Sequence, residues 1–333
     1  MFDQPSEREA RDFIEGQGLR FETGYDDLTG LYENGQLVAC GARSGYVLKM
    51  LALAPSHQGS DTLGALVTQL IQAGLKAGHA THFIFTRPQN VASFEALNFR
   101  LLASEGAVAL LEHGPGLEAW LAENSHLIVA GRNGAIVMNA NPFTLGHMHL
   151  IEVAASQVDR LYLFMVSEDC SVFPLAARLR LARAGTAHLP NVTVLETSRY
   201  AVSAGTFPSY FLKRLDEAAP AQMRLDLRVF AERIAPRFHI ATRFVGCEPL
   251  CPTTAAYNRA MEEILGGCGL GWVEVPRLEA GGAPISATRV RAAFAEGRFE
   301  ALETLVPPST LAYLRSEEAR PVAERLRTQL KGA

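Results

Sequence analysis

Along the first third of the chain, the apolar positions follow the strand period in some segments and the helix period in others. Residues 30–32 and 37–43 are predicted strands, joined at Asn34 and Gly35 by a strong hairpin signal. Residues 63–75 place leucine, isoleucine and valine on one helical face, which predicts an amphipathic helix. The other elements predicted here are helices over 5–17 and 90–99 and strands over 45–53 and 82–86.

From Ala135 onward, apolar runs of strand length alternate with helical segments. Strands separated by helices indicate a parallel sheet that is covered on both faces. In such sheets ligands bind beyond the carboxyl ends of the strands, where the strand order reverses. The strands are predicted over 135–138, 161–166, 191–195 and 242–245, and the helices over 144–158, 174–187 and 253–265.

A connector is predicted between these two regions. Glycine-rich residues 113–116 and 131–134 flank a short helical run over 117–123. We therefore expect one domain over 1–130 and a second over 131–333.

The turn after the first apolar strand carries the candidate chemistry. Thr144 and His147 are three residues apart on the first turn of a predicted helix, and Gly146 allows another group to approach the backbone closely. Unpaired N–H groups at a helix start attract anions. A hydroxyl, an imidazole and free amides at one point predict a phosphate site, in which an imidazole of pKa near 6.5 can be cationic.

A second helix start with similar chemistry is predicted at residues 285–291. Ser286 is the expected N-cap, and Arg289 and Arg291 fall on the first turns. Guanidinium groups suit phosphate oxygens because their forked donors can bind two oxygens at once. An ordinary capped helix with exposed arginines is the alternative.

Composition excludes several classes of function. The 333 residues, 48% hydrophobic and 20% charged, carry a net charge of −4, which argues against a nucleic-acid surface. Neither a signal peptide nor a membrane-spanning run is visible, so a cytoplasmic protein is expected. The 5 cysteines form no Cys-x-x-Cys pair, so no metal ligands are assigned. The loop of P-loop enzymes is also absent.

These motifs resemble a known superfamily. Thr144-Leu145-Gly146-His147 is similar to the (H/T)-x-G-H signature of nucleotidylyltransferases, and residues 285–291 are similar to their I-S-S-T-x-x-R signature, with Ala287 at the second serine. The segments 139–143, 205–213, 245–251 and 257–258 resemble the citrate lyase ligases, also called acetate:SH-citrate lyase ligases. The resemblance implies an α/β fold, with a doubly wound, Rossmann-like parallel sheet after an α+β domain similar to GNAT acetyltransferases.

The resemblance also implies a reaction and a set of residues. Acetate would attack the α-phosphorus of ATP, assisted by Mg²⁺. The acetyl-AMP formed would acetylate the phosphoribosyl-dephospho-coenzyme-A thiol on the acyl carrier subunit of citrate lyase. The catalytic residues implied are Thr144, His147 and Arg291. The nucleotide-binding residues implied are Asn139, Asn141, Pro142, Phe143, Gly146, Lys213, Gly246, Glu248, Ser286, Thr288 and Arg289.

Besides Ala287, the sequence departs from the implied pattern at four positions. Asp61 and Leu63 stand where the coenzyme A loop of acetyltransferases has glycines, so the first domain is expected to dock or to grip a coenzyme-A-like arm. Ser167 and Val172 stand where family members often carry a lysine and an arginine. Three rival functions remain: a nucleotidylyltransferase of coenzyme A or NAD synthesis, a GNAT acetyltransferase with a nucleotide-binding domain, and a non-catalytic docking protein.

Overall fold

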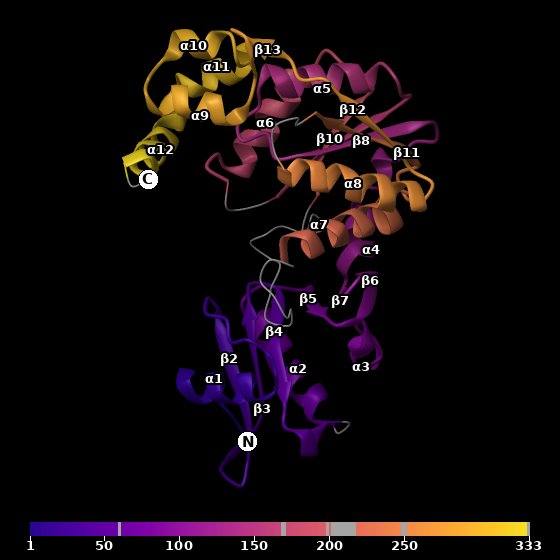
Figure 1. The fold of residues 1–333 in the computed structure, drawn as a ribbon, viewed down its shortest axis with the longest axis vertical. Coiled ribbons are helices and arrows are strands. Elements are labelled where there is room, and N and C mark those ends of the chain that lie inside the picture. Colours follow the sequence, from indigo (N-terminus) through magenta and orange to yellow (C-terminus); the bar gives the residue numbers. More distant parts are fainter. Residues whose placement is uncertain (59–60, 168–170, 198–199, 201–217, 248–251, 332–333) are drawn as a thin grey trace. The chain divides into compact units, whose positions relative to one another are not determined.

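The computed structural model describes residues 1–58, 61–167, 171–197, 200, 218–247 and 252–331. These residues form two compact units (Figure 1). Residues 1–123 and 218–229 belong to the first unit, and residues 124–200 and 230–331 belong to the second. The boundary near residue 130 stays a prediction, and the return of residues 218–229 to the first unit is a feature that the hydrophobic pattern did not indicate.

The first unit is built on a mixed sheet in the order β1-β2-β3-β4-β5-β7-β6. Among the strands that the structure describes in this sheet, only β4 and β5 pair in parallel. The strands are β1 (Phe2–Asp3), β2 (Asp27–Glu33), β3 (Gln36–Ser44), β4 (Val47–Leu53), β5 (His82–Thr86), β6 (Arg100–Glu105) and β7 (Val108–His113). The helices are α1 (Glu7–Gly16), α2 (Thr62–Lys76), α3 (Val91–Glu95), α4 (Gly116–Glu123) and α7 (Ala218–Val229). This α+β arrangement confirms the architecture expected for the N-terminal region.

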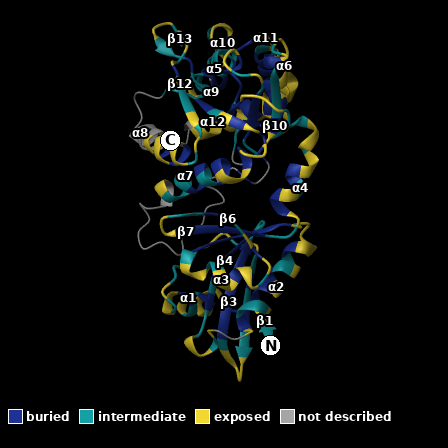
Figure 2. Ribbon diagram, turned by 90° about the vertical axis from the view of Figure 1, so that its right-hand side faces the viewer, coloured by how far each residue is buried: buried dark blue, intermediate teal, exposed yellow. Residues whose placement is uncertain are grey.

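Burial explains why α2 and α7 join this sheet. Leu66 and Leu70 of α2 are fully buried against β3 and β4, two strands whose residues are mostly buried (dark blue in Figure 2). Helix α7 packs on β6, where Arg224 and Arg228 each approach a carboxylate oxygen of Glu105 at 2.7 Å. The two arginines hold the pKa of Glu105 below its usual value, although burial opposes them.

The second unit contains a five-stranded sheet in the order β10-β9-β8-β11-β12, in which every pair is parallel. The strands are β8 (Asn133–Met138), β9 (Leu161–Met165), β10 (Val192–Glu196), β11 (Ile240–Gly246) and β12 (Gly271–Val275). Between them lie α5 (Leu145–Ala155), α6 (Leu175–Thr186) and α8 (Pro252–Gly267). From β8 the chain builds the sheet outward in one direction to β10 and then in the other to β12. Right-handed crossovers therefore place α5 and α8 on opposite faces, as Figure 1 shows.

The strand order reverses between β8 and β11, and this reversal creates a ligand-binding position at the carboxyl edge. The sheet confirms the doubly wound α/β fold predicted for the C-terminal region. After β12 come the hairpin strands β13 (Glu279–Ala280) and β14 (Ala283–Pro284) and the helices α9 (Ala287–Ala295), α10 (Phe299–Glu303), α11 (Pro308–Leu314) and α12 (Arg320–Lys331).

Short helical turns complete the description. A π-helical turn at Phe230–Ile234 follows α7, and 3-10 turns lie at Pro55–His57, Pro88–Asn90, Ser125–Leu127 and Glu317–Ala319. Among the residues that the structure describes, every helix is too short or too polar to cross a membrane.

Candidate active site

Thr144 and His147 cap the start of α5 reciprocally. The Thr144 hydroxyl accepts a hydrogen bond from the His147 backbone N–H at 3.2 Å, and the His147 Nδ1 accepts one from the Thr144 N–H at 3.0 Å. Because Nδ1 acts as an acceptor, the neutral ring carries its proton on Nε2. The sequence pattern located this cap correctly but did not indicate that the histidine ring is half of it.

The surroundings of His147 favour a neutral ring. The ring stacks on Phe143, with the two centroids 5.8 Å apart at 28°. Burial, helped by the nearby charge of Arg277, lowers the pKa of His147 to about 4. The imidazole is therefore uncharged at neutral pH in the ligand-free protein, in contrast to the cationic form considered from the sequence alone.

The second predicted helix start lies beside the first. Ser286 caps α9 and accepts a hydrogen bond from the Arg289 N–H at 3.3 Å. A Cβ atom added at Gly146 would lie 3.1 Å from the carbonyl oxygen of Ile285. The absence of a side chain at Gly146 thus lets the backbone that leads into α9 approach the first turn of α5 closely.

One cavity of about 440 Å³ joins these two turns at the carboxyl edge of the sheet. This volume lies within the range of roughly 300–1,000 Å³ that is usual for small-molecule sites. Arg277 is the only charged side chain among the described residues that line it. The lining residues are Thr144, Gly146, His147, Leu150, Gly246, Val275, Pro276, Arg277, Leu278, Ile285, Ser286, Ala287 and Thr288.

Six of the described residues implied by the resemblance line this cavity. The six are Thr144, Gly146, His147, Gly246, Ser286 and Thr288. Lys213 and Glu248 lie outside the described residues. The other described residues of the set do not line the cavity, and their contacts show what they hold in place: Asn139, Asn141, Pro142, Phe143, Arg289 and Arg291.

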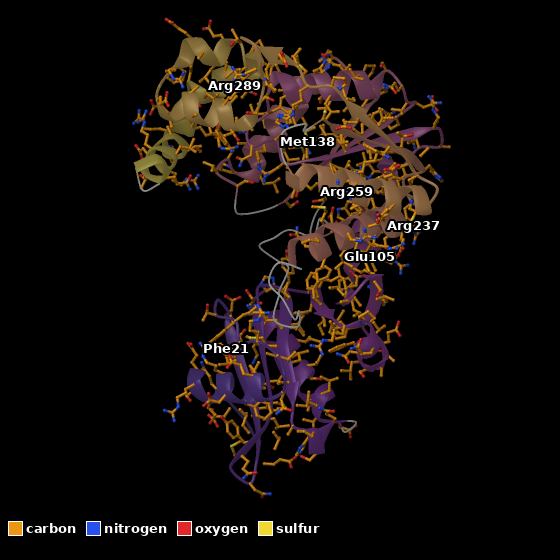
Figure 3. The ribbon with its side chains drawn as sticks, in the orientation of Figure 1. Phe21, Glu105, Met138, Arg237, Arg259 and Arg289 are labelled. Atoms are coloured by element: carbon orange, nitrogen blue, oxygen red, sulfur yellow. The ribbon has the colours of Figure 1, made fainter. Side chains whose placement is uncertain are left out.

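The loop that follows β8, whose last residue is Met138 (Figure 3), is held by a fully buried arginine. The Nη1 of Arg178 donates to the carbonyl oxygen of Asn139 at 2.9 Å and to its side-chain oxygen at 2.7 Å. Asn141 accepts a hydrogen bond from the Phe173 N–H at 3.0 Å, and a cis peptide bond joins Asn141 to Pro142. These hydrogen bonds hold the loop in the conformation that places the Phe143 ring against the His147 imidazole.

The two motif arginines bind backbone carbonyl groups. Arg291 donates to the carbonyl oxygen of Asn141 at 2.7 Å and to the Thr288 hydroxyl at 3.0 Å. The guanidinium of Arg289 (Figure 3) donates to the carbonyl oxygens of Ala280, Ala283 and Pro284. Arg291 therefore connects the two helix starts, whereas Arg289 holds the β13–β14 hairpin.

Sequence reasoning missed two cations that shape this region. Arg277 follows β12 by two residues, and its Nε donates to the carbonyl oxygen of Cys247 at 2.6 Å. The signal that could have found it is an arginine just beyond the carboxyl end of a short apolar strand. Arg178 resembles an ordinary helix arginine in the sequence, and only its complete burial shows its role.

The described residues contain no group of three or more His, Cys, Asp or Glu side chains that could hold a metal ion.

Comparisons with known proteins show the family to which this chain belongs. The citrate lyase ligase C-terminal domain family matches residues 133–314. The citrate [pro-3S]-lyase ligase of Klebsiella pneumoniae is 42% identical over 286 residues, covering 84% of each chain. The ligase of Escherichia coli K12 is 37% identical over 317 residues, covering 92% of this chain and 90% of its own.

Solved structures resemble this chain less closely. Thermotoga maritima TmcAL bound with alpha-thio ATP has a TM-score of 0.36 at 17% identity, covering 55% of each chain. The sequence relatives span most of both chains and confirm the family that the motifs indicated. The protein belongs to the citrate lyase ligase family.

Proposed function

We propose that this protein uses ATP to acetylate the thiol prosthetic group on the acyl carrier subunit of citrate lyase, through acetyl-AMP. The observation that carries the proposal is the convergence of two capped helix starts, at Thr144 and Ser286, on one cavity. Family membership supports the identity of the acid and of the carrier. We further propose that the protein acts in the cytoplasm.

The first step forms acetyl-AMP. A carboxylate oxygen of acetate attacks the α-phosphorus of ATP, a new P–O bond forms, and the bond to the leaving pyrophosphate breaks. Negative charge grows on the phosphate oxygens, so the protein contributes mainly by placing donors around them. The carboxylate is already ionised at neutral pH, and no enzyme base is needed.

His147 is the proposed donor to the α-phosphate. Its Nδ1 is occupied by the Thr144 N–H, which leaves the Nε2–H as the donor of the neutral ring. Because the imidazole is uncharged, it does not form an ion pair with the acetate carboxylate and stays available to donate to ATP. Phosphate binding nearby raises the pKa of His147 from its low ligand-free value, so that the donor strengthens as charge develops.

The start of α9 is the proposed grip for the β- and γ-phosphates. Ser286, Ala287 and Thr288 line the cavity, and Arg291 donates a hydrogen bond to the Thr288 hydroxyl. Arg277 supplies a positive charge at the cavity wall, a role that the sequence suggested for other cations. Mg²⁺ bound to the triphosphate would add charge neutralisation for the leaving pyrophosphate.

The second step transfers the acetyl group. The carrier thiol loses its proton to solvent, and its sulfur attacks the acetyl carbonyl carbon. A C–S bond forms, the C–O bond to AMP breaks, and AMP leaves. We propose that the N-terminal unit docks the carrier or its coenzyme-A-like arm.

Acetate-dependent exchange of labelled pyrophosphate into ATP tests the first step. We expect exchange with acetate alone, and acetylation of deacetylated citrate lyase when the lyase is added. Exchange that requires phosphopantetheine or nicotinamide mononucleotide would identify a nucleotidylyltransferase instead. Thioester formation from acetyl-CoA without ATP would identify an acetyltransferase.

A further inference from the structure

The β13–β14 hairpin connects two residues of the cavity wall. Its first strand follows Leu278 and its second precedes Ile285, and both flanking residues line the cavity. The Ile285 N–H donates to the Leu278 carbonyl oxygen at 2.9 Å, which closes the base of the hairpin. The two ends of the hairpin are thus joined directly to two cavity residues, and the Ser286 cap follows the second of them.

The hairpin is too short to hold its own position. Its strands have two residues each, and its turn consists of Gly281 and Gly282 at φ +63° and +74°. Both φ values fit a tight hairpin turn that favours glycine or asparagine. A two-stranded hairpin of this size is marginal in water unless other groups support it.

Arg289 provides that support from the first turn of α9. Its Nη1 donates to the carbonyl oxygens of Ala283 and Pro284, both at 2.8 Å, and its Nη2 donates to that of Ala280 at 3.1 Å. Its backbone N–H also donates to the Ser286 hydroxyl. One residue thus joins both strands of the hairpin to the cap of the helix.

We propose that Arg289 is a positioning residue that sets the affinity for ATP by holding the hairpin, and hence Leu278 and Ile285, against the nucleotide cavity. This inference rests on the proposed function, because the hairpin borders the same cavity. It differs from the sequence-based expectation that Arg289 itself binds phosphate. Turning the guanidinium into the cavity would take the donor away from three carbonyl oxygens, two of them on β14.

A double-mutant cycle separates the two roles of Arg289. Arg289→Met removes the support. Gly282→Val strains the turn, because a β-branched residue resists positive φ, and a Cβ atom at this position meets no other atoms within 4 Å. The dissociation constant for ATP is measured by calorimetry. The kcat of pyrophosphate exchange is measured at saturating ATP. Each single change is expected to raise the dissociation constant about tenfold, with kcat changed less than about twofold.

The double variant decides the proposal. If Arg289 acts through the hairpin, the double variant also binds ATP about tenfold more weakly, because either change alone already releases the hairpin. Arg289→Lys should recover part of the affinity, since an ammonium group can still donate to these carbonyl oxygens. Independent effects that multiply to about a hundredfold, or unchanged affinity in Arg289→Met, overturn the proposal.

Matched controls come from the same unit. Arg327 donates to the carbonyl oxygen of Ala295 at the far end of α9, so Arg327→Met tests general loosening of that helix and should leave ATP affinity unchanged. Gly281→Asn introduces a residue that this type of turn accepts, so it should also leave ATP affinity unchanged. If the wild-type protein binds ATP but shows no acetate-dependent exchange, the proposed function is contradicted. The ATP dissociation constants of the double-mutant cycle still test the role of Arg289 in that case. A protein that does not bind ATP contradicts both.

Discussion

Arg291 donates a hydrogen bond from Nη1 to the carbonyl oxygen of Asn141, 2.7 Å away and 150 positions earlier in the chain. Its Nη2 binds the Thr288 hydroxyl, so one guanidinium connects the loop after β8 to the first turn of α9. The spacing between the two helix starts therefore depends on this side chain.

Arg291→Met should weaken both stability and catalysis. The loss of charge-assisted hydrogen bonds is expected to lower the free energy of unfolding by about 1.5–3 kcal/mol. We expect kcat/KM for ATP to fall at least about tenfold, because a small displacement of donors weakens their contact with the phosphates. Arg315→Met is the control, since its exposed pair with Glu303 contributes little. Equal losses in both variants would contradict the role given to Arg291.

His147→Gln separates catalysis from helix capping. Glutamine is a usual partner in a reciprocal cap with threonine, so this variant keeps the acceptor for the Thr144 N–H while it removes the imidazole. We expect both His147→Gln and His147→Ala to lose at least about a hundredfold in exchange rate. Only His147→Ala should lose about 1 kcal/mol of stability in urea unfolding. Retained exchange in either variant would remove His147 from the reaction.

The low pKa of His147 predicts a pH-dependent stability. Between pH 6.5 and about 4 the unfolded chain binds a proton at this residue that the folded chain does not, so acidification favours unfolding. The stabilisation is complete above about pH 6.5 and is lost as the pH falls through about 4. From pH 7.5 to 5, the wild type should lose up to about 2 kcal/mol more than His147→Gln in urea unfolding. Parallel losses in the two proteins would contradict this assignment.

Arg277→Met tests the cation that no motif indicated. Removing its charge should raise the dissociation constant for ATP and reduce the dependence of that constant on salt, because one screened attraction to the phosphates is lost. The pKa of His147 should rise, since Arg277 helps to lower it. Calorimetry at several salt concentrations measures the first effect, and nuclear magnetic resonance titration measures the second. An unchanged salt dependence would place Arg277 away from the phosphates.

Gly185 of α6 makes room for Phe143, whose ring stacks on His147. A Cβ atom at this position would overlap the Phe143 ring, so Gly185→Ala should destabilise the protein by about 1–3 kcal/mol and reduce exchange. Gly266→Ala in α8 meets no atoms within 4 Å and should instead be neutral or stabilising by about 0.5–1 kcal/mol. Adding Phe143→Leu to Gly185→Ala should restore part of the stability, and a failure to do so would exclude the overlap as the cause.

Local signals made much of the fold predictable. The apolar runs of β8 and β9, the helix periodicity of α2 and the caps at Thr144 and Ser286 all depend on residues within a few positions. Relations across long distances left no such signal. The contact of Arg224 with Glu105 spans 119 positions, and it is one of the interactions that join α7 to the first unit.

The site was predictable in its chemistry more than in its contacts. The pattern located the hydroxyl, imidazole and glycine of the first turn because they are consecutive in the chain. It could not show that Arg289 binds carbonyl oxygens or that Arg277 lines the cavity, because each fact depends on where another segment folds. Arg178 was missed for the same reason, since its partners lie on two separate connections, the loop after β8 and the segment between β9 and α6.

A crystal structure with a non-hydrolysable ATP analogue tests the central claim most directly. We predict that the triphosphate lies between the two helix starts, with the α-phosphate about 2.7–3.2 Å from His147 Nε2 and the outer phosphates at similar distances from donors of residues 286–288. A triphosphate that touches only one of these two turns, or that lies outside the cavity, would contradict the account.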